Sequence, residues 1–186
     1  IAPVYYAWGN HELDYLAAGT SPLEEELVSA GATVLDRAWR DLDIHGTPLR
    51  LGGLYDYAFA LDDRNSCDPD RMDPEVCRFL TDFQDTERFT LMLSHRPDSF
   101  ALGEAARTWS IDLVLSGHAH GGQVVLPVLG GVFGGDLGLF SPYLHGMCRK
   151  DGLTMAVTSG LGSQRERLPR FHNPPEIMVI DLTPES

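Results

Sequence analysis

The chain alternates short apolar runs with amphipathic stretches that begin at helix-capping residues. Apolar runs of about four to eight residues are typical of strands that are covered on both faces. Two pairs of such runs are separated by turn residues and predict hairpins. The predicted strands are Pro3–Trp8, Phe89–His95, Ile111–Leu115 and Glu176–Leu182, and the predicted hairpins are Thr33–Leu54, turning near His45–Pro48, and His145–Gly160, turning at Lys150–Gly152.

Two stretches carry the signals of a helix start, in which a capping side chain precedes a proline at the first helical position. These signals are Ser21 and Pro22 for Thr20–Gly31, and Asp73 and Pro74 for Met72–Phe83. A shorter helix is expected from Asp98. Because strands and helices alternate without a convincing linker, we expect one α/β domain over residues 1–186, with mixed β-sheets flanked by helices.

The 186 residues carry 27 acidic and 14 basic side chains, which give a formal net charge of −13. A protein that binds a nucleic-acid backbone needs a basic surface, so no nucleic-acid partner is expected. The three cysteines, Cys67, Cys77 and Cys148, cannot close into a complete set of disulfides. Cys67 and Cys77 could form one, but two free thiols in a reducing compartment are expected for them. No apolar stretch approaches about 18 residues, so we expect neither a membrane span nor a signal peptide in this sequence.

Polar residues of metal-binding types follow three of the predicted strands at the point where each strand ends. Asn10 and His11 follow the first strand, His95 ends the second, and His118 and His120 follow the third. In α/β sheets, ligands bind outside the carboxyl ends of strands, because neighbouring strand ends converge there while helices cover the faces. One such histidine is more often a turn or core residue, but three similar strand ends favour a metal site over unrelated polar turns.

Three short segments together resemble the second-half motifs of the calcineurin-like metallophosphoesterases. They are GNHE at Gly9–Glu12, LSHRP at Leu93–Pro97 and SGHAHGGQ at Ser116–Gln123. The C-terminal sequence SGLGSQRERLPRFHNPPEIMVIDL is similar to the bacterial branch often called YkuE-like. The resemblance implies a metallophosphoesterase-like α/β sandwich and a bacterial hydrolase that uses two metal ions to activate water for attack on phosphorus.

The resemblance also implies a role for each residue of the three segments. Asn10, His95 and His118 match the ligands of the second metal, and His120 matches a histidine that reaches the first metal. His11 matches a histidine that faces the leaving-group oxygen, as a general acid or as a donor to the phosphate. A complete site of this kind holds two divalent ions, and imidazole nitrogens with a neutral amide oxygen suit Mn, Fe, Zn or Ni.

The spacing of His118 and His120 favours an extended segment, on which alternate side chains share a face. One backbone segment could then serve two neighbouring metals. The adjacent glycines, which allow unusual dihedrals and close approach, are Gly117, Gly121 and Gly122.

Carboxylate ligands do not accompany these residues. The family's Asp-x-His and Gly-Asp-x-x-Asp motifs do not lie upstream of Gly9. The four predicted ligands are neutral, and two divalent cations a few ångströms apart repel by several kcal/mol even at an effective dielectric of about 20. We therefore expect a domain whose N-terminal part is missing, which carries the second-metal half of the site and is inactive alone. The strand Pro3–Trp8 would then leave an exposed edge that favours self-association.

Other interpretations stay open. The missing carboxylates favour a non-catalytic binding module with one metal or none, whereas His11 favours an enzyme. A structural zinc site usually needs thiolates, and the cysteines lie far in sequence from the histidine segments. Glu12 could orient a histidine or be a surface acid. Asp98, Asp112 and Asp136 are expected to be ordinary cap, strand or loop residues.

The expected substrate is a small phosphorylated molecule, and the YkuE-like resemblance implies a lipid-linked or nucleotide-sugar compound. The loop Leu129–Tyr143 could line a lipid-facing entrance or cover the core. His145 and His172 could border the substrate pocket, whereas His45 is expected to be solvated in its turn. One basic cluster could hold phosphate or lie at the surface; it comprises Arg165, Arg167 and Arg170.

Overall fold

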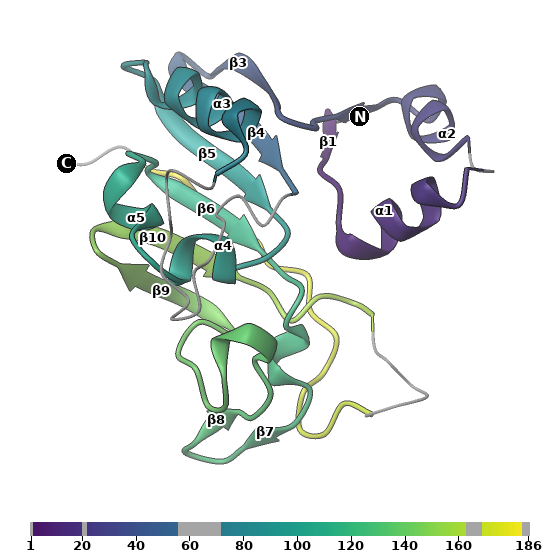
Figure 1. The fold of residues 1–186 in the computed structure, drawn as a ribbon, viewed down its shortest axis with the longest axis vertical. Coiled ribbons are helices and arrows are strands. Elements are labelled where there is room, and N and C mark those ends of the chain that lie inside the picture. Colours follow the sequence, from purple (N-terminus) through teal and green to yellow (C-terminus); the bar gives the residue numbers. More distant parts are fainter. Residues whose placement is uncertain (1, 20–21, 56–71, 163–168, 184–186) are drawn as a thin grey trace.

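The computed structural model describes residues 2–19, 22–55, 72–162 and 169–183. Short strands, short helices and turns alternate along these ranges (Figure 1). The elements are β1 Val4–Tyr6, α1 Asn10–Ala17, α2 Leu23–Ser29, β2 Ala32–Val34, β3 Ala38–Ile44, β4 Thr47–Leu54, α3 Pro74–Gln84, β5 Phe89–Ser94, α4 Asp98–Ala101, α5 Ala105–Thr108, β6 Leu113–Ser116, η2 His120–Gly122, β7 Val125–Leu126, β8 Gly130–Gly131, η3 Gly135–Leu137, β9 Gly146–Lys150 and β10 Leu153–Val157.

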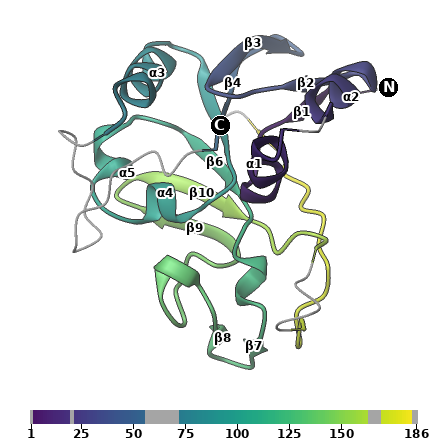
Figure 2. The same cartoon turned by 45° about the vertical axis from the view of Figure 1, so that its right-hand side comes forward.

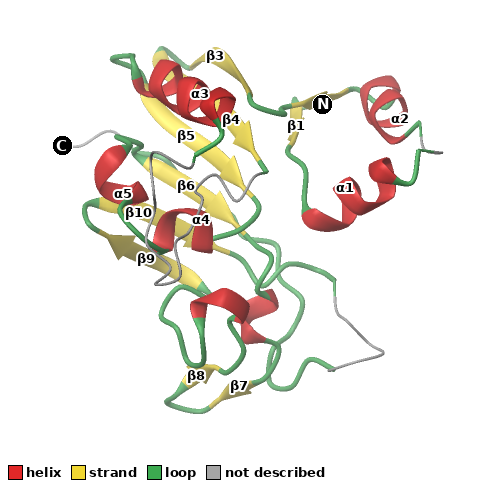
Figure 3. Cartoon of the chain, in the orientation of Figure 1, coloured by secondary structure: helices red, strands yellow, loops and turns green. Residues whose placement is uncertain are grey.

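The largest sheet has six strands in the order β3-β4-β5-β6-β10-β9. Strands β4, β5, β6 and β10 run parallel, and the antiparallel strands β3 and β9 form its two edges. Figure 3 shows the strands as one layer with helices packed beside it. The predicted α/β architecture with mixed sheets and flanking helices is therefore confirmed.

Helices α3, α4 and α5 cover one face of the six-stranded sheet (Figure 1). The start of α3 is as predicted, because Pro74 is its first residue and the Asp73 side chain accepts a hydrogen bond from the Glu75 N–H at 2.8 Å. The buried residues of α3 recur at the spacing of one helical face, so this face packs into the main core. They are Val76, Phe79, Leu80 and Phe83.

The opposite face of the sheet carries a second apolar cluster that contains Leu51 and Leu91. Figure 2 shows β1 and the C-terminal segment on this side, away from α3, α4 and α5. Residues 176–182 form no strand, so that prediction was wrong. Met178 and Ile180 pack against the cluster instead. The alternating apolar side chains of this segment thus pack on the face of the sheet, although its backbone forms no strand.

The predicted hairpin over Thr33–Leu54 is confirmed for β3 and β4, where Ile44 pairs with Thr47 across the turn. His45 in that turn is exposed, as expected, and has a φ of 54°. The first part of the stretch belongs to β2, which pairs with β1 in a separate parallel sheet of two strands. The second predicted hairpin is confirmed as β9 and β10.

Helix α2 begins at Leu23, one residue after Pro22, and Gly31 follows its end with a φ of 91°. Its predicted cap, Ser21, lies outside the described residues. None of the helices in the described part of the chain combines the length and apolar character that a membrane crossing requires.

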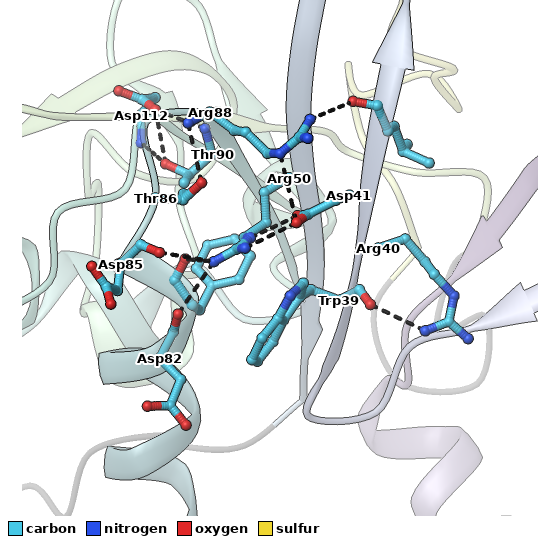
Figure 4. A network of polar contacts seen from close by, with 12 residues as sticks. Trp39, Arg40, Asp41, Arg50, Asp82, Asp85, Thr86, Arg88, Thr90 and Asp112 are labelled. Atoms are coloured by element: carbon cyan, nitrogen blue, oxygen red, sulfur yellow. Dashed lines mark hydrogen bonds and ion pairs between the residues drawn. The ribbon is translucent and has the colours of Figure 1, made fainter.

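Arg50 on β4 joins the sheet to the end of α3 (Figure 4). Its guanidinium donates to both carboxylate oxygens of Asp41, at 2.7 and 3.0 Å. It also donates to backbone carbonyls of Asp82, Phe83 and Asp85, at 3.3, 3.2 and 3.3 Å. The last carbonyls of a helix have no partner within the helix, so this cation satisfies them and complements the helix dipole.

Candidate metal centre

Strands β5 and β6 are parallel neighbours, and each ends just before a predicted metal ligand. Leu93 pairs with Leu115 in the sheet, and the N–H of Gly117 donates to the carbonyl of His95 at 3.0 Å. This bond extends the pairing past the ends of both strands. As a result, His95 and His118 lie side by side, with their ring centroids 5.0 Å apart.

Asn10 reaches the same point from a third element, as the first residue of α1. The N–H of Gly9 donates to Oε2 of Glu12 at 3.0 Å, which caps the helix start. Gly9 also packs tightly against the next ligand, because a Cβ added there would lie 3.0 Å from Cε1 of His95. Glycine at position 9 therefore lets the start of α1 approach the ends of the strands closely.

The donor atoms of Asn10, His95 and His118 form a small triangle. Asn10 Oδ1 lies 2.9 Å from His95 Nε2 and 3.2 Å from His118 Nδ1, and the two nitrogens are 3.2 Å apart. Ligands bound about 2.1 Å from one ion are about 3.0–3.4 Å from one another in octahedral or tetrahedral geometry. The three atoms therefore have the spacing of neighbouring ligands around a single cation.

Both imidazoles of the triangle favour the neutral form, which is the form that binds metals. Burial lowers the pKa of His118 to about 4, and the nearby positive charge of Arg96 acts in the same direction. Burial also lowers the pKa of His95. Near neutral pH each ring thus retains a nitrogen lone pair, and the residues present fit a divalent ion of borderline softness.

His118 and His120 do not lie on the predicted extended segment, so that expectation was wrong. Their φ angles are 61° and 48°, in the left-handed region, and His120 begins the short helix η2. Nδ1 of His120 lies 3.5 Å from Nη2 of Arg170. Burial and the Arg170 charge lower the pKa of His120. His120 nevertheless lies close enough to the triangle of donors for its charge to lower the pKa of His95 and of His118.

Asn173 holds this unusual turn in place. Its side-chain amide donates to the backbone carbonyls of His120 and Gln123, at 2.6 and 3.1 Å. These bonds span 50 or more residues of sequence, and the Asn173 side chain is buried. The left-handed conformations of His120 and Gln123 are therefore held by tertiary contacts rather than by local preference.

Arg170 extends the same support to the loop that follows β10. Its guanidinium donates to the carbonyl of Gly160 at 3.0 Å, to the side-chain oxygen of Asn173 at 3.2 Å, and to the carbonyls of Ser159 and Gly162. A guanidinium engaged with several carbonyls is not available as a phosphate clamp, so Arg170 has a positioning role. Arg165 and Arg167 lie outside the described residues.

His11 lies on the exposed side of the first turn of α1. It is close enough for its charge to lower the pKa of His95 and of His120. Glu12 also lies near His95, where its charge acts in the opposite direction, but its carboxylate caps the helix instead of orienting a histidine through a hydrogen bond. The catalytic role of His11 stays a prediction.

The acidic residues near the candidate centre have other partners, as expected. Asp98 is buried and accepts from Arg96 at 2.7 Å, and Asp136 accepts from the same guanidinium at 2.8 Å. Asp112 accepts from the N–H and the hydroxyl of Thr90, at 2.7 and 2.8 Å. These carboxylates stabilise the strand ends and the loop around them.

Among the described residues, no three or more His, Cys, Asp or Glu side chains are grouped so that they could hold a metal ion. The triangle contains only two residues of these types, because its third donor is the amide of Asn10. Cys77 and Cys148 are free thiols, and Cys67 lies outside the described residues. The thiol-based zinc site therefore gains no support from this part of the chain.

His145 and His172 both border a cavity of about 610 Å³ that also includes Gly121, the residue after His120. Nε2 of His145 lies 3.0 Å from Oε1 of Glu176, and the His172 ring stacks on Phe171 with centroids 4.2 Å apart. The sequence did not single out Asn173 or Glu176, because their partners lie far away in the chain. The only sequence signal at Asn173 is an amide side chain directly before two prolines.

A mixed α/β sheet with imidazole and amide donors at its strand ends is the arrangement expected of a metallophosphoesterase, and the comparisons agree. The chain is 31% identical over 183 residues to an uncharacterized metallophosphoesterase of Helicobacter pylori strain J99, covering 98% of the chain and 43% of that protein. It is 29% identical over 178 residues to the uncharacterized metallophosphoesterase YkuE of Bacillus subtilis, covering 94% of the chain and 54% of YkuE.

A putative metallophosphoesterase of Caenorhabditis elegans is 28% identical over 123 residues, which are 65% of the chain and 24% of that protein. The chain spans about half the length of the bacterial relatives. No family model and no solved structure matches it. The similarity over nearly the whole chain confirms the predicted resemblance to the metallophosphoesterases.

Proposed function

We propose that the protein is a metal-dependent phosphoester hydrolase with a two-metal centre, in which this chain holds the second metal through Asn10, His95 and His118. The observation that carries the proposal is the triangle of donor atoms separated by 2.9–3.2 Å. It joins three elements that are distant in sequence, and all three donors can supply a lone pair. Relatives named as metallophosphoesterases support the same reaction class.

The chemistry follows from the donor set. A divalent ion at the triangle would supply Lewis acidity toward a phosphoryl oxygen and would lower the pKa of a bound water. Asn10 and the two imidazoles would hold such an ion without neutralising its charge, which would preserve this Lewis acidity. In this proposal His11, which is exposed on the first turn of α1, exchanges a proton with a leaving-group oxygen. The substrate in this proposal is a small phosphorylated molecule.

The charge of the donor residues limits how many divalent ions this chain can bind without further ligands. Asn10, His95, His118 and His120 are neutral, and the carboxylates near them are engaged by Arg96 or cap a helix. A second divalent ion needs carboxylates to offset its repulsion from the first. We therefore propose that the isolated chain binds one ion, and that hydrolysis requires further acidic ligands, with His120 directed to the first metal.

A second candidate function follows from the same neutral donors. A module that binds one ion and does not hydrolyse esters would need no carboxylates, and the triangle alone would suffice for it. Metal stoichiometry and turnover in the full-length protein separate the two functions. An enzyme holds two ions and turns over substrate, whereas a binding module holds at most one and does not.

The test measures hydrolysis of 4-nitrophenyl phosphate with added Mn²⁺ by the full-length protein and by its His118→Ala variant. We expect the variant to lose at least about 100-fold in kcat/KM, because a ligand of the ion is removed. His45→Asn is the matched control, since His45 is exposed in a left-handed turn where Asn is tolerated. Unchanged activity of His118→Ala would refute the assignment.

A further inference from the structure

The cavity beside the metal-ligand turn has the size of a small-molecule site. Its volume of about 610 Å³ lies within the range of about 300–1,000 Å³ that is usual for ligand pockets. Gly121 forms part of its wall, one residue after His120 and three after His118. A ligand in the cavity would therefore lie against the turn that carries two of the predicted metal ligands.

The cavity wall does not suit a phosphoryl group. Its described lining contains no Lys or Arg side chain. Its one acidic residue, Glu176, already accepts hydrogen bonds from the Thr158 hydroxyl at 2.8 Å and the Ser159 N–H at 3.0 Å, and its other oxygen lies 3.0 Å from Nε2 of His145. An anionic phosphate would meet no Lys or Arg side chain of the described wall, so this wall suits an uncharged group.

Ring surfaces make up much of the rest of the wall. They come from the aromatic side chain of Phe140, the imidazoles of His145 and His172, and three prolines. Flat aromatic ligands pack against Phe140 and the two imidazoles through offset-stacked and edge-to-face contacts. The prolines, with the aliphatic side chains of Leu129 and Leu144, add apolar surface to the wall. The pair formed with Glu176 fixes the orientation of the His145 imidazole, and Nδ1 of that ring is left for a polar group of a ligand.

We propose that this cavity binds an aromatic ring in the organic part of the phosphoester, while the phosphoryl group lies on the metal side of the turn at His118–Gln123. This inference rests on the proposed function for the identity of the ligand. The contacts available from Phe140, His145 and His172 favour an aromatic group, and the described wall, which contains no Lys or Arg, does not suit a second phosphate. The cavity would thus determine which esters the protein selects.

The test uses binding to the chain without added metal, so that it does not depend on catalysis. Phenyl phosphate, octyl phosphate and glycerol 3-phosphate are titrated separately, and the imidazole C–H signals of His145 and His172 are followed by NMR. We expect phenyl phosphate to shift both signals with saturation. Glycerol 3-phosphate, which has the same charged group and no ring, should cause no saturable shift.

Two adjacent exposed residues of one loop provide matched variants. Phe140 lines the cavity and is 45% exposed, whereas Leu139 is 66% exposed and is not part of the wall. Phe140→Ser should weaken phenyl phosphate binding by about fivefold to tenfold, as expected for the loss of an aromatic contact. Leu139→Ser should change it by less than about twofold, because only the wall contacts matter.

Equal effects of the two variants would overturn the proposal, and so would shifts from octyl phosphate as large as those from phenyl phosphate. The metal site is assessed separately by Mn²⁺ titration and by activity of the full-length protein. Loss of ring binding with an intact metal site would refute the cavity assignment alone. Ring binding without any metal binding or hydrolysis would instead refute the proposed function.

Discussion

The side-chain oxygen of Asn10 lies 2.9 Å from Nε2 of His95, although 85 residues separate the two in the sequence. The contact joins the first turn of α1 to the end of β5, and His118 completes it from β6. The amide oxygen and the two neutral imidazoles bring three lone-pair donors together, and a cation could bind between them.

Replacing Asn10 tests its role as a donor. Asn10→Ala should lower the affinity of the chain for Zn²⁺ at least about tenfold, since one of three ligands is lost. Asn10→Asp should raise the affinity, because it adds a negative charge to a neutral donor set of nearly the same shape. Isothermal titration measures both values, and an Asn10→Ala affinity equal to wild type would contradict the site.

The close packing of Gly9 against His95 predicts a sensitive position. A Cβ in Gly9→Ala would lie 2.7 Å from Oε2 of Glu12 and 3.0 Å from Cε1 of His95, so α1 or the ring must shift. We expect weaker Zn²⁺ binding in this variant, by isothermal titration. Gly117→Ala is the control, because its added Cβ would meet nothing closer than 3.9 Å. Similar affinities for the two variants would argue against the close approach.

Because the Arg170 guanidinium donates several hydrogen bonds at once, we expect its removal to lower the stability of the fold. Arg170→Gln should lower the free energy of unfolding by about 2 kcal/mol, because carbonyls of Ser159 and Gly160 lose a charged donor. Arg170→Lys should restore only part of this, since an ammonium cannot reach all the acceptors at once. Urea unfolding measures both, and full rescue by Lys would show that charge alone matters.

The Asp41–Arg50 pair predicts a dependence of stability on pH. The hydrogen bond from Arg50 lowers the pKa of Asp41 below its ordinary value of 3.8. Its contribution is therefore complete above pH 3.8 and is lost as the pH falls through the lower folded pKa. Asp41 is largely solvated, so we expect about 1 kcal/mol or less.

Asp41→Asn should be less stable than wild type at neutral pH, and the difference should disappear in acid. Thermal unfolding across this pH range provides the measurement. Asp14→Asn, on the exposed side of α1, should show no such convergence. A constant difference between wild type and Asp41→Asn at all pH values would mean that the carboxylate charge is not the cause.

Local signals predicted much of the fold. The cap Asp73 with Pro74, and the apolar spacing from Val76 to Phe83, suffice to specify α3 because the information lies within one helix. The approach of the strand ends could also be anticipated, since parallel neighbours place their carboxyl ends at one edge. The metal roles of Asn10, His95 and His118 stay predictions.

The rest depends on contacts that sequence patterns do not carry. The left-handed backbone at His120 and Gln123 is held by Asn173, at a separation of about 50 residues, so the local pattern favoured an extended strand. Residues 176–182 alternate as a strand does, yet Met178 and Ile180 pack on a sheet face with no ladder to join. The bonds from Arg50 to the end of α3 likewise require the tertiary fold.

The turn at His118–Gln123 also bears on how quickly an ion would be captured. Non-glycine residues with positive φ cost about 1–3 kcal/mol each, and here the surrounding hydrogen bonds offset that cost before any ion arrives. Little rearrangement then remains for the encounter itself. Association would be limited by the departure of water from the hydrated cation, and its rate should follow the exchange lability of each metal rather than the motions of the polypeptide.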